Sequence, residues 1–136
     1  MQGISKISSD LPVNSHGTQM LSILTSSTNT QLKVGLIQYQ QGSRESLPQL
    51  MRAFTFATQQ KLNVIVYPAS TKPSLLTSKD DLRRLYSEVI DKMKKFPGTI
   101  IVSSGNEGTN IDKIPVFPAS FTDEIPNLLA VANVDT

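Results

Sequence analysis

Two short stretches of the sequence combine residue types that can carry out acyl transfer. The first, Asn14 to Met20, holds His16, the only histidine of the chain, and an imidazole is a common general base near neutral pH. The second, Ile100 to Gly108, reads Ile-Ile-Val-Ser-Ser-Gly-Asn-Glu-Gly. Its apolar start predicts a buried strand that would deliver the Asn106 amide to the sheet edge where ligands bind, as a donor to a developing negative oxygen. Each stretch also has an ordinary interpretation, because Gly-Asn-Glu-Gly is typical of a turn and a lone histidine is usually structural.

The elements that must position these residues alternate along the chain. Apolar residues at helical spacing predict helices that begin at His16, near Ser46 and near Ser78. Ser78 and Asp81 form a capping-box variant, and the third helix is predicted to continue as one element to Phe96. Runs rich in β-branched residues predict strands at 32–39, 63–67, 100–102 and 128–134. This order implies right-handed crossovers and a parallel sheet covered by helices.

Size and composition favour one globular domain over residues 1–136. The chain is 38% hydrophobic and 18% charged, which suits a packed core rather than a disordered segment. Its net charge of +2 is too small to argue for binding to nucleic acid or to an anionic membrane. It has no cysteine, which excludes a disulfide framework and thiol chemistry. No apolar run reaches the length of a membrane span.

A third stretch, near the end of the chain, must be considered together with the first two. Val116 to Ser120 reads Val-Phe-Pro-Ala-Ser, and Asn127 to Asp135 then forms an apolar run that ends in Asn-Val-Asp. Taken in order over nearly the whole chain, these three stretches resemble the subtilisin-like serine proteases (subtilases). The resemblance implies an incomplete α/β fold of three layers, in which a parallel sheet carries helices on both faces. It also implies that His16 is the catalytic base and Asn106 the oxyanion donor of a serine endopeptidase.

The resemblance further implies where a peptide or protein substrate would bind. In the family, the strand that matches 64–67 runs into Ser-Leu-Gly, whose backbone pairs with the substrate; here the matching residues are Pro68, Ala69 and Ser70. Pro68 removes one backbone donor and Ser70 replaces a glycine, which leaves open whether a peptide binds in the usual extended manner. The other implied substrate-binding residues surround Asn106: Ser104, Gly105 and Glu107. Glu107 would lie at the rim of the first specificity pocket, or it is simply a solvated loop carboxylate.

Two members of a catalytic triad find no match in the sequence. The family's nucleophile motif, of the Gly-Thr-Ser-Met-Ala type, does not occur, and the turn-like surroundings of Asp10 predict a loop residue rather than the triad acid. The chain alone is therefore expected to be inactive. It is either a fragment of a longer endopeptidase or a degenerate, non-catalytic relative that binds peptide or serves as a scaffold; a small α/β binding domain with coincidental motifs is a third alternative. No cofactor and no metal site is predicted. The residues indicate no compartment, and secretion is suggested by the family alone.

Two structural expectations follow from the same resemblance. The family's matching aromatic-Pro pair predicts that the Phe117–Pro118 peptide bond is cis. The family also places its aspartate strand, which is absent here, between the strands that match 34–39 and 63–67, so these two strands are not expected to pair directly. The absent strand would leave a gap between them, with unpaired backbone groups on both sides. These groups can find partners if the two strands close up and pair directly, if residues 2–8 insert, or if a second chain supplies a strand. We expect the last of these, self-association through exposed strand edges.

Overall fold

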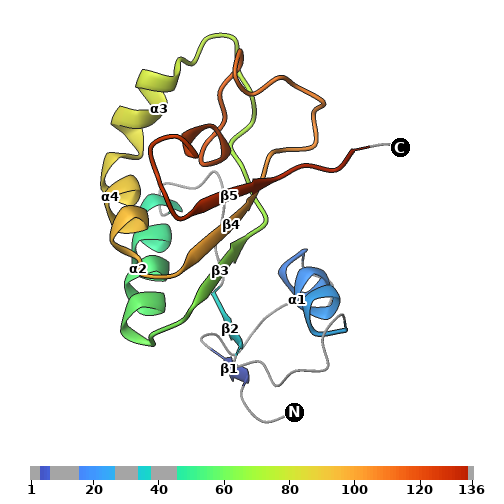
Figure 1. The fold of residues 1–136 in the computed structure, drawn as a ribbon, viewed down its shortest axis with the longest axis vertical. Helices are drawn as coiled ribbons and strands as arrows, with labels where there is room; N and C mark the ends of the chain where they lie inside the picture. Colours follow the sequence, from blue (N-terminus) through green and yellow to red (C-terminus); the bar gives the residue numbers. More distant parts are fainter. Residues whose placement is uncertain (1–3, 7–15, 27–33, 38–45, 135–136) are drawn as a thin grey trace. The chain divides into compact units, whose positions relative to one another are not determined.

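A computed structural model describes residues 4–6, 16–26, 34–37 and 46–134 of the protein (Figure 1). The chain divides into two compact units, 1–46 and 47–136, and each is described by itself. The first unit contains β1 (Ile4–Lys6), α1 (His16–Ser26) and β2 (Val34–Leu36). The second contains α2 (Ser46–Gln59) apart from its first residue, β3 (Val64–Tyr67), α3 (Lys79–Leu85), α4 (Ser87–Lys95), β4 (Thr99–Ser103), the 3₁₀ turn η1 (Ala119–Phe121) and β5 (Leu128–Val131).

In the first unit, β1 and β2 form a two-stranded parallel sheet with Ile4 opposite Val34. The helix predicted at His16 is confirmed as α1, and none of its side chains is buried. Much of the strand predicted at 32–39 lies outside the described residues. Within this unit β2 is hydrogen-bonded to β1; that the strands at 34–39 and 63–67 are not direct neighbours stays a prediction. The N-terminal arm, one of the three partners considered, is a neighbour of β2; self-association through exposed strand edges stays a prediction.

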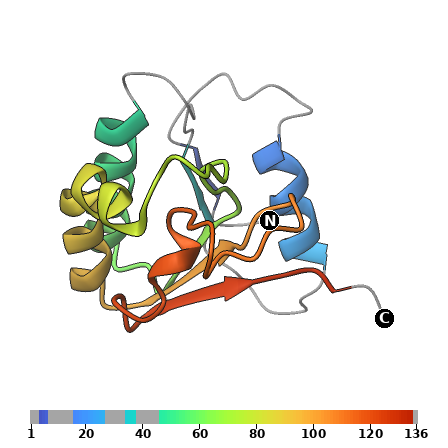
Figure 2. The same ribbon diagram turned by 90° about the horizontal axis from the view of Figure 1, so that it is seen from above.

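The second unit is built on a three-stranded parallel sheet in the order β3-β4-β5. Tyr67 lies opposite Val102 and Ser103 lies opposite Val131, so the carboxyl ends of the strands share one edge. Two perpendicular views show α2, α3 and α4 on the same face of this sheet (Figures 1 and 2). Ile100 and Val102 of β4 are buried, as alternation along a strand requires. The α/β class with a parallel sheet is therefore confirmed.

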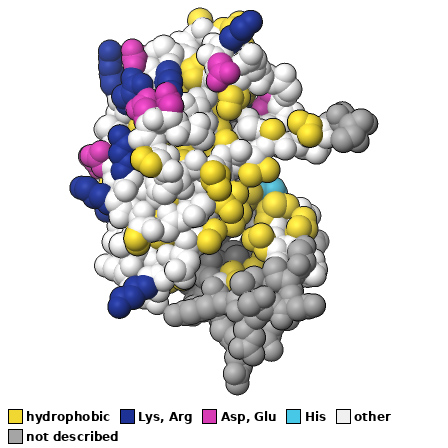
Figure 3. All heavy atoms as spheres, in the orientation of Figure 1, with side chains coloured by type: hydrophobic (Ala, Val, Ile, Leu, Met, Phe, Trp, Pro, Cys, Tyr) yellow, Lys and Arg dark blue, Asp and Glu magenta, His cyan; other side chains and the backbone are white. Residues whose placement is uncertain are grey.

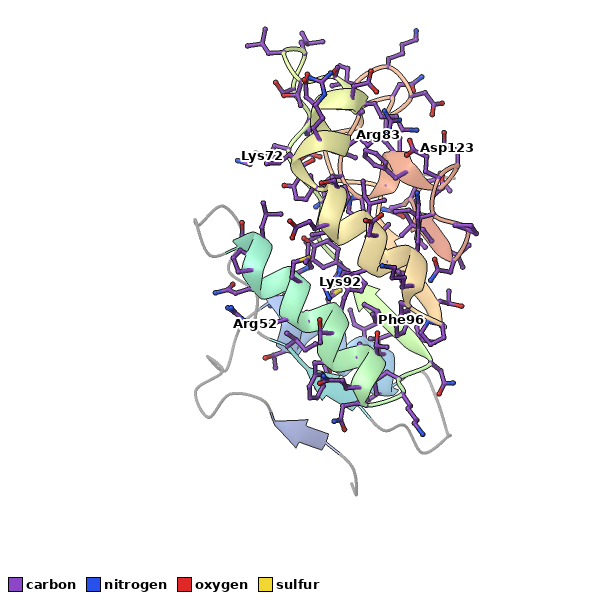
Figure 4. All side chains as sticks on the ribbon, turned by 90° about the vertical axis from the view of Figure 1, so that its left-hand side faces the viewer. Arg52, Lys72, Arg83, Lys92, Phe96 and Asp123 are labelled. Atoms are coloured by element: carbon purple, nitrogen blue, oxygen red, sulfur yellow. The ribbon has the colours of Figure 1, made fainter. Side chains whose placement is uncertain are left out.

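The core of the second unit lies between these helices and the sheet. Leu50, Phe54 and Ala57 are the buried face of α2, and they belong to the stripe that helical spacing predicts. Between α4 and α2, the Lys92 ammonium donates to Thr55 Oγ1 at 2.9 Å (Figure 4). The aliphatic stem of a lysine can thus pack between two helices while its charged end keeps a polar partner.

The end of α2 is a Schellman motif. Leu62 N–H donates to Ala57 O at 3.0 Å, and Lys61 N–H donates to Thr58 O at 3.1 Å. Lys61 takes the left-handed conformation that this motif requires, with φ of 53°. A glycine is usual at this position because it has no Cβ, so the lysine is held there at a conformational cost.

The single helix predicted from Ser78 to Phe96 is wrong in one respect, because it is divided into α3 and α4 at Tyr86. Tyr86 has φ of −103° and ψ of 16°, away from helical values, and its ring stacks on Phe117 with ring centroids 4.0 Å apart. No glycine or proline marks the break, so the sequence does not reveal it. The predicted capping box is confirmed: Asp81 N–H donates to Ser78 Oγ, and Ser78 N–H donates to the Asp81 carboxylate.

The turn between α4 and β4 is held by one asparagine side chain and one close backbone approach. The Asn127 amide donates to the carbonyl oxygens of Met93, Phe96 and Gly98 at 3.1, 2.9 and 2.8 Å. A Cβ on Gly98 would lie 2.1 Å from Asn63 O, which leaves room for glycine alone. These contacts tie the end of α4 to the beginnings of β3 and β5.

The other face of the β3-β4-β5 sheet is apolar and exposed within the second unit. Val64, Val66, Leu129 and Val131 are 49, 39, 55 and 57% exposed. Figure 3 views the molecule in the orientation of Figure 1 and shows Lys and Arg side chains gathered on the side of the helices, with hydrophobic side chains away from it. Parallel sheets are normally covered on both faces, so the exposure of this apolar face within the unit is unusual.

Candidate functional site

The candidate site lies where β3 and β4 end at their common edge. β3 passes into the loop that begins Pro68-Ala69-Ser70, and β4 passes into the turn from Ser104 to Gly108. Ser104 N–H still donates to Val131 O at 3.0 Å, so this turn starts from a fixed position beside β5. Loops at the carboxyl edge of a parallel sheet are the usual location of ligand sites.

The turn after β4 depends on its two glycines. Gly105 and Gly108 have φ of 99° and 61°, values that side chains with a Cβ rarely adopt. Gly105 N–H donates to Ser103 Oγ at 3.1 Å, which fixes the entry to the turn. The sequence-based prediction that glycines on either side of Asn106-Glu107 allow a sharp turn is therefore confirmed.

Asn106 lies at the exposed tip of this turn. Its backbone N–H donates to Glu107 Oε2 at 2.9 Å. Its side-chain amide makes no hydrogen bond with any of the residues that the structure describes, so both N–H groups remain available as donors. The residue type, its place at a strand end and this availability are what an oxyanion donor needs.

The carboxylate of Glu107 folds back over the turn. A Cβ added to Gly105 would lie 2.8 Å from Glu107 Oε2 and 3.6 Å from Ser70 Oγ. Gly105 therefore lies between the carboxylate and the loop that follows β3. This proximity brings together Ser70, Gly105 and Glu107, three of the residues predicted to bind substrate.

The loop after β3 is also anchored to the third sequence stretch. Thr71 N–H donates to Phe117 O at 2.8 Å, and Phe117 N–H donates to Thr71 Oγ1 at 2.8 Å. The Phe117–Pro118 bond is cis, as predicted. Phe117 is buried, and its ring meets that of Phe121 edge to face at 5.6 Å. The loop after β3, the turn after β4 and the segment around Phe117 thus meet at one edge of the sheet.

Ser120 and Ser103, two serines close to the loops of this edge, have structural partners. Ser120 Oγ accepts from Val116 N–H at 3.0 Å and donates to Ile111 O at 3.1 Å. Ser103 Oγ accepts from Gly105 N–H. Neither stands at a sharp strand-to-helix turn with a neighbouring base, which an activated nucleophile requires.

His16 is the exposed first residue of α1 and belongs to the first unit, whereas Asn106 belongs to the second. Within the second unit, the structure brings together Ser70, Gly105 and Glu107 beside Asn106. The pairing of His16 with Asn106 stays a prediction. In the described ranges, no three His, Asp or Glu side chains gather closely enough to hold a metal ion. Among the helices described, none is both long and apolar enough to cross a membrane.

A cavity of about 500 Å³ lies beyond the predicted residues, between the start of α3 and the loop before η1. Leu75, Leu76, Lys79, Ile111 and Lys113 are among its lining residues. Leu75 and Leu76 are 86 and 95% exposed, so the cavity opens directly to solvent. No motif in the sequence indicates it, because its walls come from two loops without a characteristic spacing.

Ion pairs join α3 to the residues that follow η1. Lys79 Nζ lies 2.7 Å from Asp123 Oδ1, and Arg83 Nε donates to Glu124 at 3.0 Å (Figure 4). The hydrogen bond from Arg83 holds the pKa of Glu124 below its usual value, and that from Lys79 does the same for the pKa of Asp123. Both carboxylates are therefore charged at neutral pH and tie α3 to the chain segment before β5.

The functional assignment must come from this chain's own residues. The segments after β3 and β4 and the segment around Phe117 form one continuous edge, with an available amide at Asn106 and a carboxylate beside it. No protein-family model matches the sequence, and neither a curated protein nor a solved structure matches the chain.

Proposed function

We propose that the chain is the central part of a subtilisin-like serine endopeptidase core, with His16 as general base and Asn106 as oxyanion donor. The observation that supports this most is the meeting of three segments at the carboxyl edge of the sheet. Ser70 lies beside Gly105, and Thr71 and Phe117 exchange two hydrogen bonds. These are the segments that would line a cleft for an extended peptide in such an enzyme.

In this proposal the two named residues divide the chemistry of acyl transfer. His16 would take the proton from a serine hydroxyl as it attacks the peptide carbonyl, and return it to the leaving amine. The Asn106 amide would donate to the oxygen that becomes negative in the tetrahedral intermediate. The chain has no residue that matches the nucleophile or the triad acid, so we expect the chain by itself to be inactive.

We also propose that the sheet of the second unit is the middle of three layers. The exposed apolar face formed by Val64, Val66, Leu129 and Val131 supports a second helical layer. Leu129→Lys tests this. Under a helical layer the buried ammonium should lower the free energy of unfolding by about 2 kcal/mol or more. On a face open to water the change should stay within about 0.5 kcal/mol.

The proposed enzyme is tested by the sequence that the gene encodes on either side of these residues. An Asp-Thr-Gly or Asp-Ser-Gly strand end before them, and a Gly-Thr-Ser helix after them, are expected. In that longer protein, Asn106→Ala should lower kcat for a peptide ester by about 10²–10³ with little change in KM. This magnitude is the one established for the oxyanion asparagine of subtilisin. Flanking segments without these motifs would contradict the endopeptidase.

The purified chain of 136 residues gives a second test. It should hydrolyse neither peptide esters nor casein, and a fluorophosphonate probe should not label it. Activity that survives repurification and disappears in His16→Ala would overturn the proposal that the chain lacks a nucleophile. An extended peptide should nevertheless shift the amide resonances of residues 69–71 and 104–107, and shifts confined to other residues would count against a substrate cleft at this edge.

A non-catalytic peptide-binding or scaffold domain is the second candidate. Glu107 supports it, because its carboxylate lies beside Gly105 and accepts from Asn106 N–H, where negative charge opposes a nearby oxyanion. Pro68 supports it as well, because it lacks a backbone donor for an extended peptide. Peptide binding by the longer protein without hydrolysis would favour this candidate over the enzyme.

A further inference from the structure

β3 is an edge strand, and in the described part of the chain only β4 is hydrogen-bonded to it. Thr99 N–H donates to Asn63 O at 2.9 Å, so the peptide groups of Asn63 point toward β4. In a parallel ladder this direction alternates along the strand, so those of Ile65 also face β4. The N–H and C=O groups of Val64 and Val66 therefore point outward.

No further outward N–H group is available on either side of Val64 and Val66. On one side, Leu62 N–H is already used by Ala57 O at 3.0 Å. On the other side, Pro68 has no N–H, and proline is found where the N–H of an edge strand would face outward. The remaining outward donors are those of Val64 and Val66, which lie symmetrically about Ile65. An edge with this symmetry is complementary to a second, oppositely directed copy of itself.

We propose that two copies of this chain associate by antiparallel pairing of their β3 strands, centred on Ile65. In this register, Val64 of each copy exchanges both N–H···O bonds with Val66 of the other, about a twofold axis. The side chains of Val64 and Val66, 49 and 39% exposed, meet as β-branched pairs on the apolar face of the sheet. β3 carries no charge, so nothing repels the second copy, and it lacks the internal lysines or bulges that protect other edges.

The dimer is expected to be weak. A four-residue strand is about 13 Å long, so its pairing buries far less than the ~1,600 Å² of a standard stable interface. Association should therefore appear between micromolar and millimolar concentrations. The proposal uses only the backbone of the second unit and concerns the chain of 136 residues, because in the longer endopeptidase the family's aspartate strand would occupy this edge of β3.

Sedimentation equilibrium over this range of concentrations tests the proposal on the full chain. The average mass should rise from the monomer value of 14.9 kDa toward twice that value. Val66→Pro removes one outward N–H without touching a bond to β4, so it should abolish the rise while the circular dichroism stays unchanged. Val66→Thr keeps the N–H and the β-branch, and should still associate. A monomer at every concentration, or equal association of the proline and threonine variants, would overturn the proposal.

Single cysteines test the register, because the chain has no cysteine of its own. Val64 and Val66 of opposite copies would have Cα atoms about 5.5 Å apart, within the range of a disulfide. A mixture of Val64→Cys and Val66→Cys chains should cross-link under mild oxidation much more than either variant alone. Equal cross-linking in all three samples would overturn the register. If Val66→Pro does not fold, the cross-linking of this mixture tests the antiparallel pairing of β3 in its place.

Discussion

Replacing Asn127 by alanine removes the side chain that holds the turn between α4 and β4. Two N–H groups of its amide serve three carbonyl oxygens at 2.8 to 3.1 Å, those of Met93, Phe96 and Gly98. A hydrogen bond contributes about 1 kcal/mol net, and a buried acceptor left without a donor costs about 1–3 kcal/mol. Met93 and Phe96 are 1 and 2% exposed, so their carbonyl oxygens would be left without a donor in a buried environment. We therefore expect the free energy of unfolding to fall by about 2 kcal/mol.

Urea denaturation followed by circular dichroism measures this loss. Asn106→Ala is the matched control, because Asn106 is exposed and its amide bonds no described residue, and its effect should stay within about 0.5 kcal/mol. Asn127→Asp is a sharper variant, since at pH 7 a carboxylate would face carbonyl oxygens and offer no donor. At pH 7 it should be less stable than the alanine variant. The carbonyl oxygens raise the pKa of this carboxyl in the folded protein, so the difference should shrink as pH falls through the raised value and be smallest below the unfolded pKa of about 3.9. An aspartate variant as stable as the wild type at pH 7, or an alanine variant no less stable than the control, would refute the reasoning.

Three further predictions concern single positions of the second unit. Gly98→Ala places a Cβ 2.1 Å from Asn63 O, so it should destabilise the protein by more than about 2 kcal/mol in the same assay; an unchanged urea midpoint would contradict this. Lys61→Gly removes the Cβ from a residue in the left-handed conformation, with φ of 53°. It should raise the free energy of unfolding by about 0.5–1 kcal/mol in thermal denaturation. A loss of stability would show that contacts of the lysine side chain outweigh this conformational cost. Arg83 lowers the pKa of Glu124 in the folded protein. The Glu124 carboxylate therefore contributes fully to the free energy of unfolding above its unfolded pKa of about 4.3, and this contribution is lost as pH falls through its lower folded pKa. Arg83→Gln should therefore flatten the stability profile in acid, and a profile that is unchanged by this substitution would exclude the pair as its cause.

The local elements could be predicted because each has a signal in the sequence. The Ser78 capping box, the buried stripe of α2 and the apolar run of β4 follow directly from spacing and residue type. Gly105 and Gly108 predicted a turn, and both have positive φ. The cis bond at Phe117–Pro118 came from the family resemblance, since composition alone favours trans.

What could not be predicted depends on contacts between distant residues. The break at Tyr86 coincides with a ring stack on Phe117, thirty-one positions further along the chain. Glu107 was left as either a pocket rim or a solvated carboxylate, and only the geometry reveals that it folds over Gly105. Leu85 is apolar and ends α3 next to the break at Tyr86, yet it is 58% exposed.

The attachment of α3 gives this helix a different sensitivity to solution conditions from the rest of the second unit. Leu82 is its only buried residue, and charged contacts hold it to the segment around η1: Lys79 with Asp123, with Glu124 and over the Phe121 ring, and Arg83 with Glu124. Dissolved salt screens charges on an exposed surface, whereas the apolar contacts of α2 and α4 are not weakened by it. At high ionic strength α3 should therefore undergo local unfolding before the sheet does, and its amide hydrogens should exchange with solvent while those of β4 remain protected.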